Sequence, residues 1–143
     1  MPQDAIEGRC LCGAVRITLS VPNTHVEVCH CDMCRRWGGA YFVGLDGESF
    51  TIAGEEAVRT YNASAWGERA FCGTCGSNLW YKFLPTGNRS FLAGLFADAD
   101  SYPVEKEIFV DEQARWCDLS GDHARLTGEE EIAAAKAAGF TFD

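Results

Sequence analysis

Residues 72–76 read Cys72-Gly73-Thr74-Cys75-Gly76, and this stretch is the strongest indication of how the chain folds. Two cysteines separated by two residues are typical of a zinc knuckle, in which a tight turn brings both sulfurs to one point. Gly76 suits the positive φ that such turns often require. The stretch therefore predicts one half of a metal site on a turn.

A second pair of cysteines, in Cys10-Leu11-Cys12-Gly13, offers the other half of that site. Alternate residues of a straight strand lie about 7 Å apart, whereas the sulfurs of a tetrahedral zinc site lie roughly 3.8 Å apart. The pair can share a metal only if the chain bends, and Gly13 tolerates a bend. With Cys72 and Cys75 the pair would complete a closed and therefore structural zinc site. Such a site would close a long loop, so much of its binding free energy would appear as folding free energy.

A third cluster, Cys29-His30-Cys31-Asp32-Met33-Cys34, places three thiols within six residues and has no obvious fourth ligand nearby. Three protein ligands with an open position are the arrangement of a catalytic zinc. The alternative is that these cysteines are buried or redox-active thiols. Cys117 stands alone, and we expect a small buried residue there; as a distant fourth ligand it would close the open position.

Composition and charge exclude several classes of protein. The chain has 143 residues, which suits one domain, and 21 acidic against 12 basic side chains give a formal net charge of −9. This acidity argues against a nucleic-acid partner. Neither a secretory signal nor an apolar run of about 18 residues is visible, so we expect no membrane partner. We therefore expect a cytoplasmic protein. In that reducing compartment, spaced cysteines favour metal binding over disulfides.

Strand patterns dominate the chain. Residues 14–20 alternate apolar and polar side chains, as in a half-buried strand. Further short strands are expected at residues 26–29, 40–45, 50–53, 57–61, 68–71, 79–83, 90–95 and 106–109. Turn-forming residues separate these runs at short intervals. The pattern predicts a mainly β, antiparallel architecture.

One helix is predicted, at the C-terminus. Thr127 suits an N-cap, Glu130 completes a capping box three residues later, and Gly139 is placed to end the helix. Ile132 and a few alanines are its only apolar residues, so we expect a lightly docked appendage. We therefore divide the chain into a zinc-binding β domain at residues 4–126 and a short helical tail at 127–143.

The cysteine motifs, in this order, resemble the glutathione-dependent formaldehyde-activating (GFA) family. The resemblance rests on residues 8–15, 29–36 and 71–79, with a weaker match at 107–111 and Trp116, and it covers about residues 4–126. It implies a zinc-stabilised antiparallel β-tent fold with two zinc ions. The implied structural ligands are Cys10, Cys12, Cys72 and Cys75, and the implied catalytic ligands are Cys29, Cys31 and Cys34.

The resemblance also implies an activity. The family's reaction adds glutathione to formaldehyde, giving S-hydroxymethylglutathione, so the expected enzyme is a zinc-dependent carbon-sulfur lyase acting on an adduct of an aldehyde with glutathione or another thiol. The open zinc position would bind either the thiol or the aldehyde oxygen. Three thiolate ligands weaken Lewis acidity, which favours capture of the thiol. The alternatives are a non-catalytic zinc scaffold that binds a protein, and a redox thiol protein.

Residues beside the three-cysteine cluster are candidates for substrate contact. Arg35 or Arg36 would hold a glutathione carboxylate through a bidentate contact, the alternative being plain surface charge. Trp37 suits either the core or a pocket wall. Asp32 is expected to be a solvated turn carboxylate.

The histidines are expected to have no role in the site. His30 lies between two cysteines and would serve as a base or a ligand, but we expect it to point outward or to bond nearby backbone. His25 and His123 adjoin turn residues and are expected at the surface or at caps. The sequence leaves the oligomeric state open.

Overall fold

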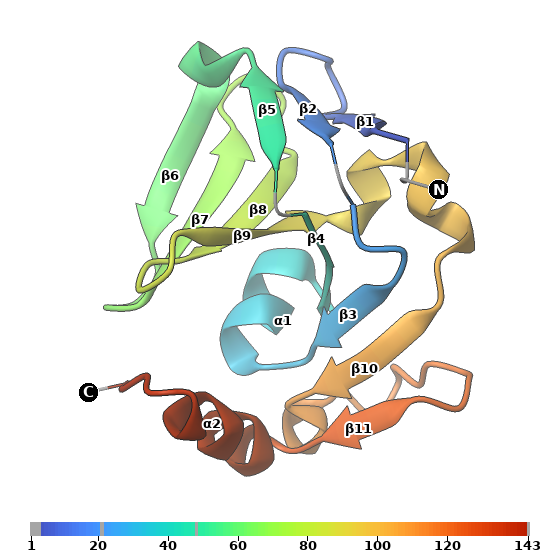
Figure 1. Ribbon diagram of the computed structural model, residues 1–143, viewed down its shortest axis with the longest axis vertical. Helices are drawn as coiled ribbons and strands as arrows, with labels where there is room; N and C mark the ends of the chain where they lie inside the picture. Colours follow the sequence, from blue (N-terminus) through green and yellow to red (C-terminus); the bar gives the residue numbers. More distant parts are fainter. Residues whose placement is uncertain (1–3, 21, 48, 143) are drawn as a thin grey trace.

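The computed structural model describes residues 4–20, 22–47 and 49–142 (Figure 1). Asp143, the last residue of the predicted tail, lies outside these ranges. A three-stranded sheet has the order β1-β2-β5, formed by β1 (Ile6–Arg9), β2 (Arg16–Leu19) and β5 (Phe50–Ala53). An eight-stranded sheet has the order β11-β10-β3-β4-β9-β8-β7-β6. Its strands are β3 (Val26–Cys29), β4 (Phe42–Asp46), β6 (Val58–Asn62), β7 (Gly67–Cys72), β8 (Asn78–Phe83), β9 (Asn88–Leu92), β10 (Val104–Ile108) and β11 (Ala124–Leu126).

Two short α-helices complete the fold, α1 (Asp32–Gly38) and α2 (Gly128–Ala137). The mainly β architecture with a C-terminal helix is thus confirmed. Most strand pairs are antiparallel, as predicted, but β10 pairs in parallel with both β3 and β11. Within the described ranges, neither helix has the length and hydrophobicity needed to cross a membrane.

The strand predictions agree with the structure to within about two or three residues, and those at 26–29 and 50–53 coincide with β3 and β5. Two strands and one α-helix were not predicted, namely β1, β11 and α1, and neither were four short 3-10 helices at Glu55–Ala57, Ala93–Leu95, Ala97–Ser101 and Val110–Glu112. β1 and β11 each carry few apolar side chains, and α1 lies inside the cysteine motif without a helical apolar period. The prediction of a single helix was therefore wrong, because α1 forms through its cap and its packing rather than through its pattern.

The core lies between the two sheets. Its largest fully buried side chains come from β2, β4, β8, β9 and the turn after β9, and they include Ile17, Leu19, Leu45, Leu79, Phe91 and Phe96. Gly8 lets β1 approach this core, since a Cβ there would lie 2.7 Å from the Phe96 ring. The small sheet is therefore held by apolar burial against the large one.

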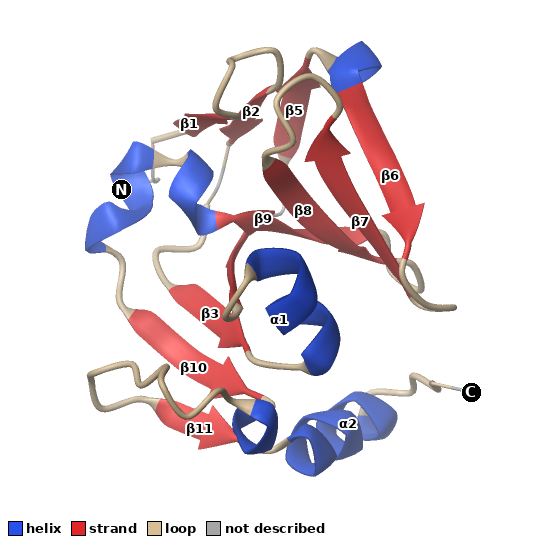
Figure 2. Cartoon of the chain, turned by 180° about the vertical axis from the view of Figure 1, so that it is seen from behind, coloured by secondary structure: helices blue, strands red, loops and turns tan. Residues whose placement is uncertain are grey.

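Helix α1 sits between the two ends of the large sheet. Figures 1 and 2 show it beside β3, with β6–β9 on one side and α2 with the C-terminal residues on the other. Trp37 of α1 stacks on Phe42 of β4 with ring centroids 5.4 Å apart. The loop that carries the three-cysteine cluster is thus enclosed by elements from both ends of the sheet.

The predicted capping box of α2 is present, with Thr127 and Glu130 bonded reciprocally. Only Gly128 of the helix is buried, as expected for a lightly docked helix. The residues after the helix differ from that expectation, because Phe140 packs on Phe83 and Phe142 packs on Trp66. These contacts tie the end of the chain to β8 and to the turn before β7.

Candidate metal centres

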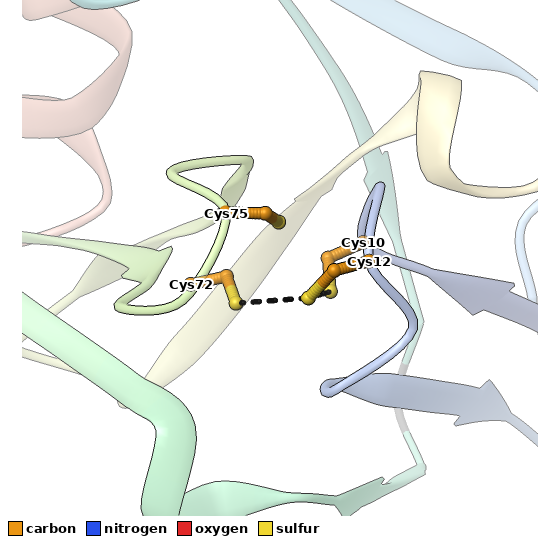
Figure 3. A group of neighbouring side chains, drawn as sticks. All are labelled: Cys10, Cys12, Cys72 and Cys75. Carbon is orange, nitrogen blue, oxygen red and sulfur yellow. Dashed lines mark hydrogen bonds between the residues drawn. The ribbon is translucent and has the colours of Figure 1, made fainter.

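Four cysteines from two turns converge between the sheets (Figure 3). Cys10 and Cys12 lie on the turn after β1, Cys72 ends β7, and Cys75 lies on the turn that follows it. Their ligand atoms all lie within 4.8 Å of one another. The Sγ atoms of Cys10 and Cys12 are 3.7 Å apart, and those of Cys12 and Cys72 are 3.9 Å apart. These spacings match the roughly 3.8 Å expected around a tetrahedral zinc, so the four residues can hold a metal ion.

Backbone and hydroxyl groups hold these sulfurs in place. The amide of Val15 donates to Cys10 Sγ at 3.4 Å, and the Ser77 hydroxyl lies 3.2 Å from Cys75 Sγ. The Ser77 hydroxyl and amide lower the pKa of Cys75 to about 5, which favours the thiolate that binds a metal. Gly76 has a φ of +80°, as the turn was predicted to require.

The second group consists of Cys29, Cys31 and Cys34, whose sulfurs also lie within 4.8 Å of one another. Cys29 ends β3, Cys31 is the N-cap of α1, and Cys34 lies in the first helical turn. The amide of Cys34 donates to Cys31 Sγ at 3.4 Å. Hydrogen bonds from the Cys29 and Cys34 thiols lower the pKa of Cys31, and the nearby Arg69 guanidinium adds to this effect. The cap geometry therefore brings the three sulfurs to one point.

Arg69 of β7 is a component of this site that the sequence reasoning missed. Its guanidinium is buried and donates to Cys34 Sγ through Nη1 at 3.7 Å and Nη2 at 3.6 Å. The same guanidinium lies over the rings of Trp37 and Tyr81, 4.9 and 5.1 Å from their centroids. An isolated arginine in a strand pattern carries no sequence signal for such a contact. The structure thus places a fixed positive charge against a thiol of the three-cysteine group.

His30, between Cys29 and Cys31 in the chain, is fully buried and bonds the side chain of Glu107, so the expectation of an outward or backbone-bonded side chain was wrong. Its Nε2 lies 2.6 Å from Oε1 of Glu107, which is itself fully buried on β10. The parallel pairing of β10 with β3 places that carboxylate beside the cysteine loop.

Glu107 also binds two residues near β11. His123 Nε2 lies 2.5 Å and Arg125 Nε 3.0 Å from its Oε2. Burial raises the pKa of Glu107, but the hydrogen bonds from His123 and His30 and the charge of Arg125 outweigh it and lower the pKa overall. The His123 side chain is only 5% exposed, so its predicted surface position was wrong. His25 remains partly exposed and pairs with Glu105.

A cavity of about 900 Å³ opens beside the second group. Cys29, Cys31 and Cys34 line it together with Arg69 and Tyr81. Burial raises the pKa of Tyr81 to about 12, so its hydroxyl stays protonated at neutral pH. The four-cysteine group contributes no residue to this cavity among those the structure describes. The two groups therefore differ in access as well as in ligand number.

The predicted substrate contacts lie on α1, next in the chain to Asp32, Met33 and Cys34, which line this cavity. Arg35 donates to the backbone oxygen of Glu112 at 2.9 Å, and the exposed Arg36 pairs with Asp32 at 3.1 Å. Among the described residues that line the cavity, neither arginine nor Trp37 is included. Their role in substrate contact stays a prediction.

The remaining predictions concern Cys117 and Asp32. Cys117 is buried and belongs to neither cysteine group, which confirms the expected small buried residue. Asp32 is exposed, as expected, although it lies in the first turn of α1 rather than in an isolated turn.

The sequence model of a family described as glutathione-dependent formaldehyde-activating enzyme (GFA) matches residues 5–112. This match covers most of the chain and contains all seven clustered cysteines. The chain belongs to the GFA family. The GFA resemblance of the cysteine motifs is thereby confirmed.

Relatives of this GFA protein agree with that assignment. It is 26% identical over 126 residues to an uncharacterized lyase of Schizosaccharomyces pombe, covering 87% of this chain and 92% of the relative. It is 29% identical over 126 residues to a putative glutathione-dependent formaldehyde-activating enzyme of Halomonas elongata, covering 80% of each chain. A crystal structure of a Rhodobacter sphaeroides protein matches with a TM-score of 0.57 and 22% identity, over 69% of this chain and 99% of that one. That likeness shows a shared fold.

Proposed function

We propose that this protein is a zinc-dependent carbon-sulfur lyase acting on an adduct of an aldehyde with glutathione or a similar thiol, such as S-hydroxymethylglutathione. The observation that carries the proposal is the grouping of Cys29, Cys31 and Cys34 at the wall of a large cavity. The names of the relatives point to the same chemistry. The closed four-cysteine group would hold a second, structural zinc.

In the synthetic direction, the thiolate sulfur of the substrate attacks the aldehyde carbon and a carbon-sulfur bond forms. The carbonyl π electrons move to the oxygen, which takes up a proton, and the reverse reaction releases the thiol and the aldehyde. A zinc ion held by the three cysteines would supply the positive charge that keeps the substrate thiol deprotonated.

Two side chains of the cavity would assist this reaction. Arg69 offsets negative charge at the cysteine group, because three thiolates and one Zn²⁺ together carry −1. Tyr81 lines the same cavity with a protonated hydroxyl, which can donate a hydrogen bond to the aldehyde oxygen. Arg69 acts on the ligand sulfur and is a positioning residue.

The test of the proposed function is a comparison of Cys34→Ser with Cys117→Ser. We expect wild type to bind two zinc ions and to accelerate adduct formation above the rate in buffer, since thiols and aldehydes also combine without a catalyst. Cys34→Ser removes one ligand of the open group, so one zinc and the acceleration should be lost while the chain stays folded. Cys117→Ser makes the same chemical change at a buried cysteine outside both groups and should keep both properties.

Metal analysis, circular dichroism and the rate of adduct formation would be measured together on the three proteins. An undiminished rate of adduct formation in a Cys34→Ser protein that has lost this zinc would contradict the proposal. Two zincs that never respond to added glutathione, with no acceleration in wild type, would favour the non-catalytic scaffold.

Replacement of Arg69 by methionine is expected to weaken zinc binding at the three-cysteine group by 10- to 100-fold. The reason is that residues which hydrogen-bond to metal ligands typically contribute about that factor to affinity. Arg69→Lys keeps the charge and should restore part of the affinity. Competition with a chromophoric chelator would measure the effect, and Arg59→Met, at an exposed arginine of β6, is the matched control. Equal affinities in Arg69→Met and wild type would contradict the assigned role.

A further inference from the structure

The chain beyond residue 112, where the GFA match ends, forms one wall of the cavity. Ile132 and Ala135 of α2 line it, followed by Phe140 and Phe142. Figure 2 shows this segment running past α1 to the opposite end of the large sheet. The cavity therefore has the cysteine group on one side and the C-terminal segment on another.

Two phenylalanines of this segment pack on two aromatic side chains from the turn before β7 and from β8. Phe140 packs edge-on against Phe83 with ring centroids 5.0 Å apart, and Phe142 packs edge-on against Trp66 at 5.4 Å. Phe83 and Phe142 are themselves 6.4 Å apart. All four residues line the cavity. We call this set, Trp66, Phe83, Phe140 and Phe142, the aromatic wall.

The start of α2 fixes the direction of the segment. The amide of Gly128 donates to Asp111 Oδ1 at 2.8 Å, and Lys106 pairs with Glu131 at 3.9 Å. Gly128 also allows contact with Phe109, because a Cβ there would lie 2.6 Å from that ring. The helix is thus held at its first turn, and the phenylalanines hold the end of the chain.

The chemistry of the wall does not suit a hydroxymethyl group. That group carries no carbon chain able to cover aromatic rings, and the phenyl rings of Phe83, Phe140 and Phe142 offer no hydrogen-bond partner for its oxygen. A charged part of glutathione placed there would lose its hydration without compensation. An alkyl or aryl group, in contrast, would gain free energy by leaving water against these rings.

We propose that the aromatic wall makes this protein selective for adducts of apolar aldehydes larger than formaldehyde. The inference rests on the proposed function, since the same cysteine group would act on the carbon-sulfur bond. The bond changes are those of the formaldehyde reaction, because the alkyl or aryl substituent on the aldehyde carbon takes no part in them. That substituent occupies the part of the cavity beside the aromatic wall.

The test is a chain-length series of aldehydes with glutathione as the thiol. We expect kcat/KM, measured above the rate in buffer, to rise from formaldehyde to hexanal, by up to about fourfold per methylene that becomes fully buried. Binding is measured separately by calorimetry with S-methylglutathione and S-hexylglutathione, which undergo no turnover, and the hexyl compound should bind more tightly.

The double variant Phe140→Ala/Phe142→Ala should lower the ratio of kcat/KM for hexanal to that for formaldehyde by roughly tenfold. The matched control is Tyr61→Ala, which removes an exposed aromatic ring of β6 outside the cavity lining and should keep the wild-type ratio. Thermal unfolding of each variant would show that it is folded.

The possible failures can be told apart. Acceleration of the formaldehyde reaction without dependence on chain length, and with equal binding of the two S-alkyl compounds, would overturn the selectivity and leave the proposed function standing. Absence of acceleration with every aldehyde would overturn the proposed function. Tighter binding of S-hexylglutathione in that case would still support an apolar ligand at the aromatic wall, and equal binding would reject both.

Discussion

Replacing Cys72 by serine is expected to leave the protein largely unfolded at 25 °C. Cys72 is fully buried, and its sulfur faces those of Cys10, Cys12 and Cys75 at the junction of the two sheets (Figure 3). Structural zinc sites bind with about 10–16 kcal/mol in peptides, whereas a whole protein is stable by only about 5–15 kcal/mol. Loss of this site therefore removes an amount of free energy similar to the whole free energy of unfolding of a protein.

The length of chain between the two cysteine pairs adds to this effect. Cys12 and Cys72 are separated by 59 residues, so folding has to close a long loop, and without a metal no binding free energy at these cysteines offsets the entropy cost of that closure. Circular dichroism and zinc content would be measured for Cys72→Ser and for wild type treated with a chelator. Cys117→Ser, which alters a buried cysteine outside both groups, should stay folded with two zincs. A folded Cys72→Ser protein of unchanged melting temperature would show that the four-cysteine group is not structural.

Replacing Glu107 by glutamine is expected to lower the free energy of unfolding by about 3 kcal/mol. Glu107 is fully buried and is the shared partner of His30, His123 and Arg125. Removal of one partner of a buried ionic network leaves the others without compensation, which typically costs about 3–5 kcal/mol. The change would be measured by urea unfolding at neutral pH.

The stabilisation by Glu107 is also expected to depend on pH. The pKa of Glu107 in the folded protein lies below its ordinary value of 4.5, so the folded state binds the proton less tightly than the unfolded state. The contribution is therefore fully present above pH 4.5 and is lost as pH falls through the lower folded-state pKa. The difference between wild type and Glu107→Gln should be constant near neutrality and should shrink in acid. Loss of metal in acid affects both proteins and cancels in that difference.

Glu105→Ala is the matched control for Glu107→Gln. Glu105 lies two residues earlier on the same strand and also pairs with a histidine, His25, but its side chain is 52% exposed. Exposed ion pairs contribute about 0–1 kcal/mol, so this variant should remain close to wild type at every pH. Equal losses of stability in the two variants would mean that the buried Glu107 network stabilises the fold no more than the exposed pair of Glu105 with His25 does.

Local sequence was sufficient to predict most strands and the C-terminal helix. The alternation in residues 14–20 and the glycine-rich turns reflect a pleated backbone with one buried face. The pair Thr127 and Glu130 reflects a capping interaction between neighbours in the chain. Helix α1 escaped prediction because seven residues without an apolar stripe carry no helical period, and its N-cap is Cys31, a residue read as a metal ligand.

The cysteine spacing by itself determined two pairs, one group of three and a lone Cys117, because ligands a few residues apart reach a common point through a single turn. Only the tertiary structure brings the two pairs together. The tertiary structure decided which other side chains meet those cysteines. Arg69 reaches Cys34 only because β7 lies across from α1, and Glu107 reaches His30 because β10 pairs with β3 in parallel. The aromatic wall likewise joins the end of the chain to β8 and the turn before β7. Contacts between residues so far apart depend on strand order and register, which no local pattern records.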